Sequence, residues 1–283
     1  MALRLPLRPA NRLLKPVRET GTLLDQLYDQ FLFYGRVLSS LPRGVRYRKE
    51  IMALISDITV GSGALVIGGG MFFVVVSTTF FTGTEVGLEG FAGLHQIGAQ
   101  SFVGVISSLA NTREITPIVA GIALAAQVGA GYTAQIGAMR VAEEIDALEV
   151  MGVDSFVYLV CTRVVAAVLT MIPLYLAALF ASYIASQVIV TRFFTLAIGQ
   201  YQHYFRLFLP PIDVAYSFIK AITFAVIVTL VHCYYGYYAS GGPVGVGIAA
   251  GRAIRASIIA VVITSMLMSF LFWGGTGTAK LVG

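Results

Sequence analysis

Charged residues are scarce in this chain. Only 12% of its 283 residues are Asp, Glu, Lys or Arg, whereas 57% are hydrophobic. An average soluble domain carries about 25% charged residues, so this composition excludes an ordinary soluble protein and indicates an integral membrane protein. The two cysteines, Cys161 and Cys233, lie far apart inside apolar runs. They indicate neither a disulfide framework nor a metal site, and we expect no bound metal.

The motifs of common enzyme chemistry are also missing. The chain has no G-x-x-x-x-G-K-[ST], and its Gly-rich stretch at 241–247 lacks the Lys and the hydroxyl of a nucleotide-binding loop. Its three histidines, His95, His203 and His232, are scattered over separate segments, without H-x-x-x-H or G-x-S-x-G. We therefore expect no catalytic residue and no cofactor on this chain, which disfavours an intramembrane enzyme.

Basic residues gather at the N-terminus. Ten of the nineteen Lys and Arg fall in the first fifty residues, where they interrupt any apolar core that a secretory signal would need. Apolar side chains recur there at steps of three and four, at Leu24, Leu27, Phe31, Tyr34 and Leu38. This pattern predicts a helix lying in the membrane interface, and a soluble helix that packs on another subunit is the alternative. The basic stretch 43–49 before the first span predicts a cytoplasmic N-terminus.

The rest of the chain contains five apolar runs, each long enough to cross a bilayer. They lie at about 52–81, 99–138, 156–190, 211–238 and 252–275. We predict an all-α integral membrane protein with a basic N-terminal segment, 1–50, followed by one membrane domain, 51–283. The odd number of spans puts the C-terminus outside the cytoplasm, and connections 139–155 and 239–251 inside. The outer loop 82–98 contains no Lys or Arg, in agreement with this orientation.

The second span is predicted to be interrupted at TREITP, residues 112–117. Thr116 followed by Pro117 is typical of a helix start, so a helix is expected to begin again there. Arg113 and Glu114 then lie at membrane depth, where ionisable side chains are costly unless they pair or face water. We predict that they pair with each other. Such a pair is either a functional site or an ion pair that only holds the interruption together.

A short acidic stretch, MRVAEEIDALEVM at 139–151, separates the second and third spans. As a helix it is about 20 Å long, too short and too acidic to cross the hydrocarbon. Val141, Ile145 and Leu148 then form one narrow apolar face, and the polar remainder includes Arg140, Glu143, Glu144 and Asp146. We predict a cytoplasmic helix that docks in a groove of a soluble partner, as the coupling helices of ATP-driven transporters do. A solvated turn is the alternative.

Candidate lipid-path residues are few. Asp213 and Lys220 lie seven residues apart on the fourth span, and therefore near each other on one face. The aromatic residues Phe72, Phe73 and Phe80 of the first span fit a lipid-lined cavity. Most apolar side chains of any membrane protein face lipid or a neighbouring helix, which is the alternative for these three.

Three motifs resemble those of the MlaE/YrbE permeases. AAQVGAGYTAQIGAMRVAEEIDALEVMGVD resembles the main motif of that family, TREITP its L-R-E-(L/I)-x-P, and YYGYYASGGPVGVGIAAGRAI its Gly-rich loop. They follow in the family's order over residues 113–255. Gln127 stands where many members carry Arg or Lys, Gln135 where many carry Glu, and Glu144 where Gln is commoner. The form EEIDALEVMG is similar to the YrbE subunits of actinobacterial Mce systems.

This resemblance implies a permease subunit of an ABC-type lipid transporter in the cytoplasmic membrane. It implies as partners a second YrbE/MlaE-like permease in a heterodimer, a cytoplasmic ATPase dimer that binds ATP and Mg, and MCE proteins on the outer side. The cargo would be lipids such as fatty acids, moved between the membrane and the cell envelope, and no nucleic acid is expected.

Two alternatives remain at this stage. An ion-coupled secondary transporter suits the interrupted span and Lys220, but it leaves the acidic helix unexplained. A purely structural scaffold would be recognised by the absence of lipid from the purified complex.

Overall fold

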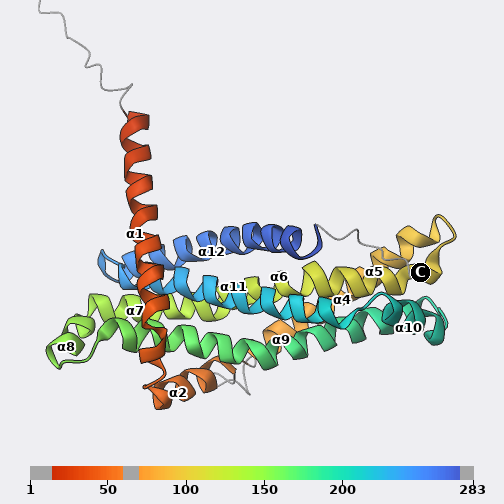
Figure 1. The fold of residues 1–283 in the computed structure, drawn as a ribbon, viewed down its shortest axis with the longest axis horizontal. Helices are drawn as coiled ribbons and strands as arrows, with labels where there is room; N and C mark the ends of the chain where they lie inside the picture. The colour runs from red at the N-terminus through yellow and green to blue at the C-terminus, as the bar shows by residue number, and fades with distance from the viewer. Residues whose placement is uncertain (1–14, 60–69, 275–283) are drawn as a thin grey trace, which may run out of the picture.

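The computed structural model describes residues 15–59 and 70–274, and all regular elements within these ranges are helices (Figure 1). The first are α1 (Lys15–Gly44), α2 (Arg48–Thr59) and α4 (Met71–His95). Then follow η1 (Gln100–Phe102), α5 (Val103–Ala110), η2 (Asn111–Ile115), α6 (Thr116–Leu124), η3 (Ala125–Gly129), α7 (Ala130–Val141) and α8 (Glu144–Val150). The last are η4 (Val157–Cys161), α9 (Thr162–Val188), η5 (Ile189–Phe193), α10 (Ile198–Leu207), α11 (Pro211–Tyr237) and α12 (Gly242–Trp273).

Five helical segments of the described ranges are long and apolar enough to cross a membrane, which confirms the predicted all-α membrane protein. They are Met71–His95, Gln100–Val141, Val157–Phe193, Pro211–Tyr237 and Gly242–Trp273. Together they form an elongated bundle, with α8 at one end and α10 at the other (Figure 1).

The first and last spans differ from the predicted ranges. Instead of one run at 52–81, α2 is a separate short helix and α4 continues through the predicted outer loop to His95. Residues 60–69 of that run lie outside the described residues. At the other end, α12 begins at Gly242 rather than near 252, because Gly241 and Gly242 adopt positive φ angles of 89° and 70°. Glycine reaches these angles without steric cost, so the chain reverses within a few residues and the next helix starts at once.

The second span is not broken at TREITP. Residues 100–141 form one continuous helical segment with π-turns at η2 and η3. An α-helix does begin again at Thr116, as predicted, but Ile115 and Thr116 both keep right-handed helical angles, so the interruption is a π-turn and not a break. A π-turn widens the helix locally and tolerates a proline that would disrupt a regular α-helix.

The α4 helix packs closely along α9, because glycines of α4 face serines of α9. A Cβ atom on Gly83 would collide with the carbonyl oxygen of Ser182, and one on Gly87 would meet Ser186 and Ile189. Small residues let membrane helices approach in this way, where no hydrophobic effect drives them together.

The α1 helix lies across the long helices rather than along them (Figure 1). Phe33 and Val37 are buried against the start of the third span, in a cluster with Phe156 and Val160. Of the predicted apolar stripe, Tyr34 packs against this cluster, whereas Phe31 and Leu38 are exposed. The side chains of Leu24 and Leu27 lie outside the described residues. The helix therefore has one apolar face for the bundle and exposed apolar side chains beside it, as suits a helix lying in a membrane surface.

Candidate functional site

Pro117 determines the local chemistry of η2. A proline has no N–H group, so the carbonyl that its N–H would have bonded has no backbone donor. This carbonyl lies four residues earlier in an α-helix and five residues earlier in a π-turn. These are the carbonyls of Arg113 and Thr112. Two side chains of α11 replace the missing donor: Lys220 Nζ donates to the Arg113 carbonyl at 2.8 Å, and Ser217 Oγ donates to the Thr112 carbonyl at 2.6 Å.

Arg113 forms an ion pair with Asp213 at the beginning of α11. Its Nη2 lies 2.7 Å and its Nε 2.8 Å from Asp213 Oδ2. The indole Nε1 of Trp273 donates to the other carboxylate oxygen at 2.9 Å, and the Arg113 guanidinium lies 5.1 Å from the Trp273 ring centroid. Each oxygen of this nearly buried carboxylate thus has a partner.

Glu114 forms a second ion pair, with Lys220. Lys220 Nζ lies 2.9 Å from Glu114 Oε2, and it also donates to Ser269 Oγ at 2.6 Å. Ser265 donates to Glu114 Oε2 at 3.1 Å, and Ser269 donates to Glu114 Oε1. The Lys220 side chain is fully buried, whereas the Glu114 side chain is 42% exposed. In this ion pair the Lys220 ammonium is inaccessible to solvent, and the Glu114 carboxylate forms the accessible, open side.

We call Arg113, Glu114, Asp213 and Lys220 the four-charge cluster. Its residues come from the second and fourth spans, and its formal charges sum to zero. Ser265, Ser269 and Trp273 connect it to the fifth span. Asp213 lies in the first turn of α11, and Lys220 lies seven residues, roughly 10 Å, further along that helix. One ion pair therefore lies near the end of the fourth span, and the other lies further toward its middle.

The prediction that Arg113 and Glu114 pair with each other is wrong. Adjacent residues on a helix point about 100° apart, so each side chain meets a different charge of α11. Asp213 and Lys220 were expected to share a face, and the structure does bring both against η2. Sequence reasoning missed the α12 side chains Ser265, Ser269 and Trp273. Their spacing of four residues places them on one helix face, which was the available signal.

The aromatic candidates lie elsewhere. Phe72, Phe73 and Phe80 of α4 are exposed by 46%, 62% and 40% and make no part of the four-charge cluster. They face outward from this single chain. Among the described residues no group of three or more His, Cys, Asp or Glu could hold a metal ion.

The acidic stretch at 139–151 is divided into two helices. α7 ends at Val141, Glu143 takes a left-handed conformation with φ of 60°, and α8 begins at Glu144. The predicted apolar face is not free for a partner as a whole, because Ile145 is fully buried and Leu148 is half-buried in the cluster around Phe33. Val141 alone of the three is exposed. The turn at Glu143 rotates α8 so that its apolar side packs on its own chain.

The exposed side of α8 has a different composition. Glu143 and Glu144 are exposed and form no ion pair with any residue that the structure describes. Asp146 forms an ion pair with Arg140, with Arg140 Nη1 2.9 Å from Asp146 Oδ1. At the far end Val150 and Met151 are 89% and 69% exposed. The helix thus presents two free carboxylates followed by two apolar side chains.

A further buried charge, Arg163, lies at the same end of the bundle. Its Nη1 donates to the Leu159 carbonyl at 2.8 Å and its Nη2 to Gln135 Oε1 at 3.2 Å. The guanidinium also lies 5.3 Å from the ring centroid of Tyr132. Gln135 stands where the MlaE/YrbE resemblance leads one to expect Glu, and its amide oxygen occupies the acceptor position.

Comparisons with known proteins identify a family and several relatives of this chain. A family model described as permease MlaE matches residues 60–271. A probable ABC transporter permease protein of Rickettsia prowazekii is 35% identical over 209 residues, which cover 74% of this chain and 81% of the relative. A probable ABC transporter permease protein of Synechocystis is 30% identical over 261 residues, 91% of this chain and 94% of the relative.

A plant protein is similar as well. The chloroplastic protein TRIGALACTOSYLDIACYLGLYCEROL 1 of Arabidopsis thaliana is 27% identical over 204 residues, which cover 72% of this chain and 58% of the relative. The family model covers most of the chain, including all the helices of the four-charge cluster. The chain therefore belongs to the MlaE permease family and is a multi-pass transmembrane subunit of the ABC transporter permease type.

Proposed function

We propose that this chain is the permease subunit of an ATP-driven lipid transporter, and that the four-charge cluster contacts the polar headgroup of the cargo. The cluster carries the proposal because it is a polar site within the spans whose Glu114 side chain remains 42% exposed. Charged side chains inside a membrane domain are costly and are retained where they pair or meet a polar pathway. The lipid in the printed name of the Arabidopsis relative supports lipid as the cargo class.

The remaining parts of the proposal follow the same family. The end of the bundle that carries α8 lies in the cytoplasm with the N-terminus, and the C-terminus lies outside the cytoplasmic membrane. A dimer of ABC ATPases, which binds ATP and Mg, docks on α8. A second permease chain and MCE proteins complete the complex, and fatty acids or related lipids are carried. An ion-coupled secondary transporter is not favoured, because the relatives are ABC transporter permeases.

The test is a Glu114→Gln variant in the complete complex reconstituted in vesicles. Gln retains the size of the side chain but removes the charge that the open side of the cluster presents. A charge-assisted hydrogen bond contributes about 1.5–3 kcal/mol, so we expect ATP-dependent lipid transfer to fall roughly tenfold or more. Glu89→Gln, an exposed carboxylate of α4, is the matched control and should transfer lipid normally. Equal transfer by the two variants, with equal assembly, would refute the headgroup role.

A further inference from the structure

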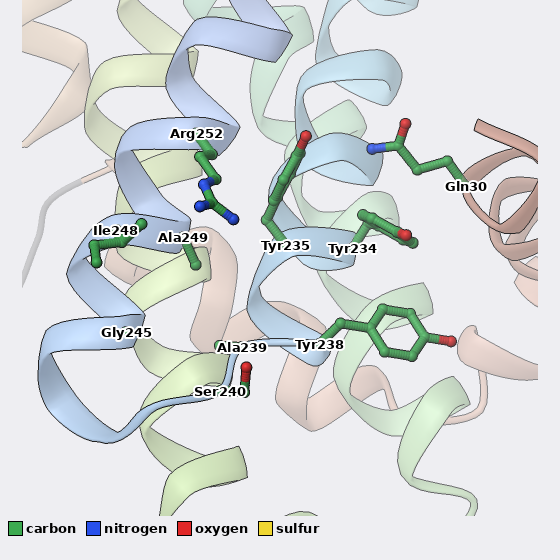
Figure 2. A pocket seen from close by; sticks show the side chains of 10 residues that line it. All are labelled: Gln30, Tyr234, Tyr235, Tyr238, Ala239, Ser240, Gly245, Ile248, Ala249 and Arg252. Carbon is green, nitrogen blue, oxygen red and sulfur yellow. The ribbon is translucent and has the colours of Figure 1, made fainter. Parts of the chain in front are cut away.

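A groove lies between α1, α11 and α12, at the end of the bundle opposite Asp213 and Trp273. Its volume is about 700 Å³, and its polar lining comes from Gln30, Tyr234, Tyr235, Tyr238, Ser240 and Arg252. Figure 2 shows Arg252 of α12 and Gln30 of α1 pointing toward the groove from opposite sides, with Tyr234 and Tyr235 between them. The four-charge cluster contributes none of these residues.

The lining of the groove suits an anion. Among the described residues that line it, Arg252 alone is charged, and it forms no ion pair with another described residue. The tyrosine and serine hydroxyls and the Gln30 amide can all donate hydrogen bonds. Asp29 carries its charge close to Tyr234 but does not line the groove. One guanidinium surrounded by neutral donors is a good arrangement for phosphate oxygens.

Three features place the groove at the headgroup level of the membrane. The α1 helix on one side lies across the bundle, as a helix in the membrane surface would (Figure 1). The adjacent tyrosines of α11 match the aromatic residues that concentrate at membrane interfaces. Arg252 and Trp273 both belong to α12 and are 21 residues apart, roughly 30 Å, which is the thickness of the hydrocarbon core. If the indole of Trp273 lies at one boundary, Arg252 lies at the other.

We propose that this groove binds the phosphate group of a phospholipid from the adjacent leaflet, with Arg252 as its ionic partner and the tyrosine hydroxyls as donors. A phospholipid fits better than free phosphate because the groove also contains Ile248, and exposed apolar side chains such as Ile259 continue along α12 toward the membrane interior. The lipid chains can lie along this face while the headgroup occupies the groove. The site is separate from the proposed cargo site and does not depend on its function.

The experiment titrates the purified full-length protein in detergent with dihexanoylphosphatidylglycerol and measures bound lipid by native mass spectrometry. Arg252→Gln is expected to weaken binding roughly tenfold or more, as the loss of a charge-assisted bond predicts. Arg255→Gln is the matched control, because Arg255 is exposed on the same helix but does not line the groove, and it should bind as the wild type does. Tyr235→Phe removes one hydroxyl with little risk to folding and should weaken binding to a smaller extent.

Two further ligands identify the source of the phosphate. Dihexanoylglycerol has the same chains without the phosphate and should bind far more weakly to the wild type, and inorganic phosphate should not compete at concentrations similar to the lipid. Equal losses in Arg252→Gln and Arg255→Gln would show general attraction to a basic surface and overturn the site. Equal binding of dihexanoylglycerol would overturn the role of the phosphate, and competition by inorganic phosphate at similar concentrations would overturn the lipid as its source.

Discussion

At the scale of single residues, Pro117 organises the polar interior. Its missing N–H leaves the backbone of the π-turn one donor short, and Ser217 and Lys220 of α11 donate to the Thr112 and Arg113 carbonyls there. The Lys220 ammonium is thereby held beside Glu114 as well. One residue without an N–H group thus explains why an amine is buried between spans.

The ion pair of Arg113 and Asp213 can be tested by removing one partner or both. Arg113→Gln leaves a buried carboxylate without its cation, and breaking a buried pair in this way costs about 3–5 kcal/mol. The double variant Arg113→Gln, Asp213→Asn leaves two neutral amides that can bond to each other and to Trp273. We therefore expect the single variant to have a clearly lower thermal unfolding midpoint in detergent, and the double variant to recover part of the loss. A double variant no more stable than the single one would contradict the pairing.

At the scale of elements, α8 shows how one turn changes a surface. The left-handed conformation at Glu143 separates α8 from α7 and directs Ile145 into the chain's own core. The exposed side chains include the carboxylates Glu143 and Glu144, which form no ion pair among the described residues, and the apolar tip of Val150 and Met151. A partner that docks here would meet charges first, and charges mainly determine orientation and association rate.

We expect the double variant Glu143→Lys, Glu144→Lys to lose the ATPase subunit. Two charge-assisted bonds contribute about 3–6 kcal/mol together, so association should weaken roughly a hundredfold or more. The membrane helices should be unaffected because both side chains are exposed. The control is Glu85→Lys, Glu89→Lys on α4, which changes the net charge equally. The measurement is co-purification of the ATPase with each double variant. If the two double variants retain the ATPase equally, α8 is not the docking element.

At the scale of the whole molecule, the bundle is asymmetric in its burial. The third span is the most buried of the five candidate spans, whereas α12 is the least buried. The apolar face that α12 exposes includes Ile263, Met266, Leu267 and Phe270. In a bilayer such side chains can face lipid, so exposure alone does not identify a partner. In the proposed complex, the partly open four-charge cluster beside α12 would face the second permease.

We expect the functional complex to contain two permease chains, this one and a related second one. The reason is that the described chain has only five candidate spans and leaves the Glu114 side chain 42% exposed, and a second permease would cover this open side. Native mass spectrometry of the complex purified from its own membranes should find the 30.3 kDa chain together with one other permease. A monomeric preparation that moves lipid between vesicle leaflets would show this expectation to be wrong.

The amino-acid sequence by itself determined that this is a membrane protein and which family it belongs to. Low charge and long apolar runs require a membrane, because only helices with satisfied backbone groups and apolar side chains are stable there. Local patterns also identified Arg113, Glu114, Asp213 and Lys220 as unusual, since any charge within a span is costly. These inferences depend on composition and short spacing, which the chain carries in any conformation.

Only the tertiary structure decided which charges meet and which faces remain exposed. Arg113 and Glu114 are adjacent in sequence, yet their partners lie about a hundred residues away on α11, because helix geometry directs neighbouring side chains apart. The π-turn at η2 and the left-handed Glu143 rotate whole helix faces by a fraction of a turn. Periodicity counted along the sequence assumes a regular helix, so it could not anticipate that Ile145 would be buried or that Lys220 would bond to a backbone carbonyl.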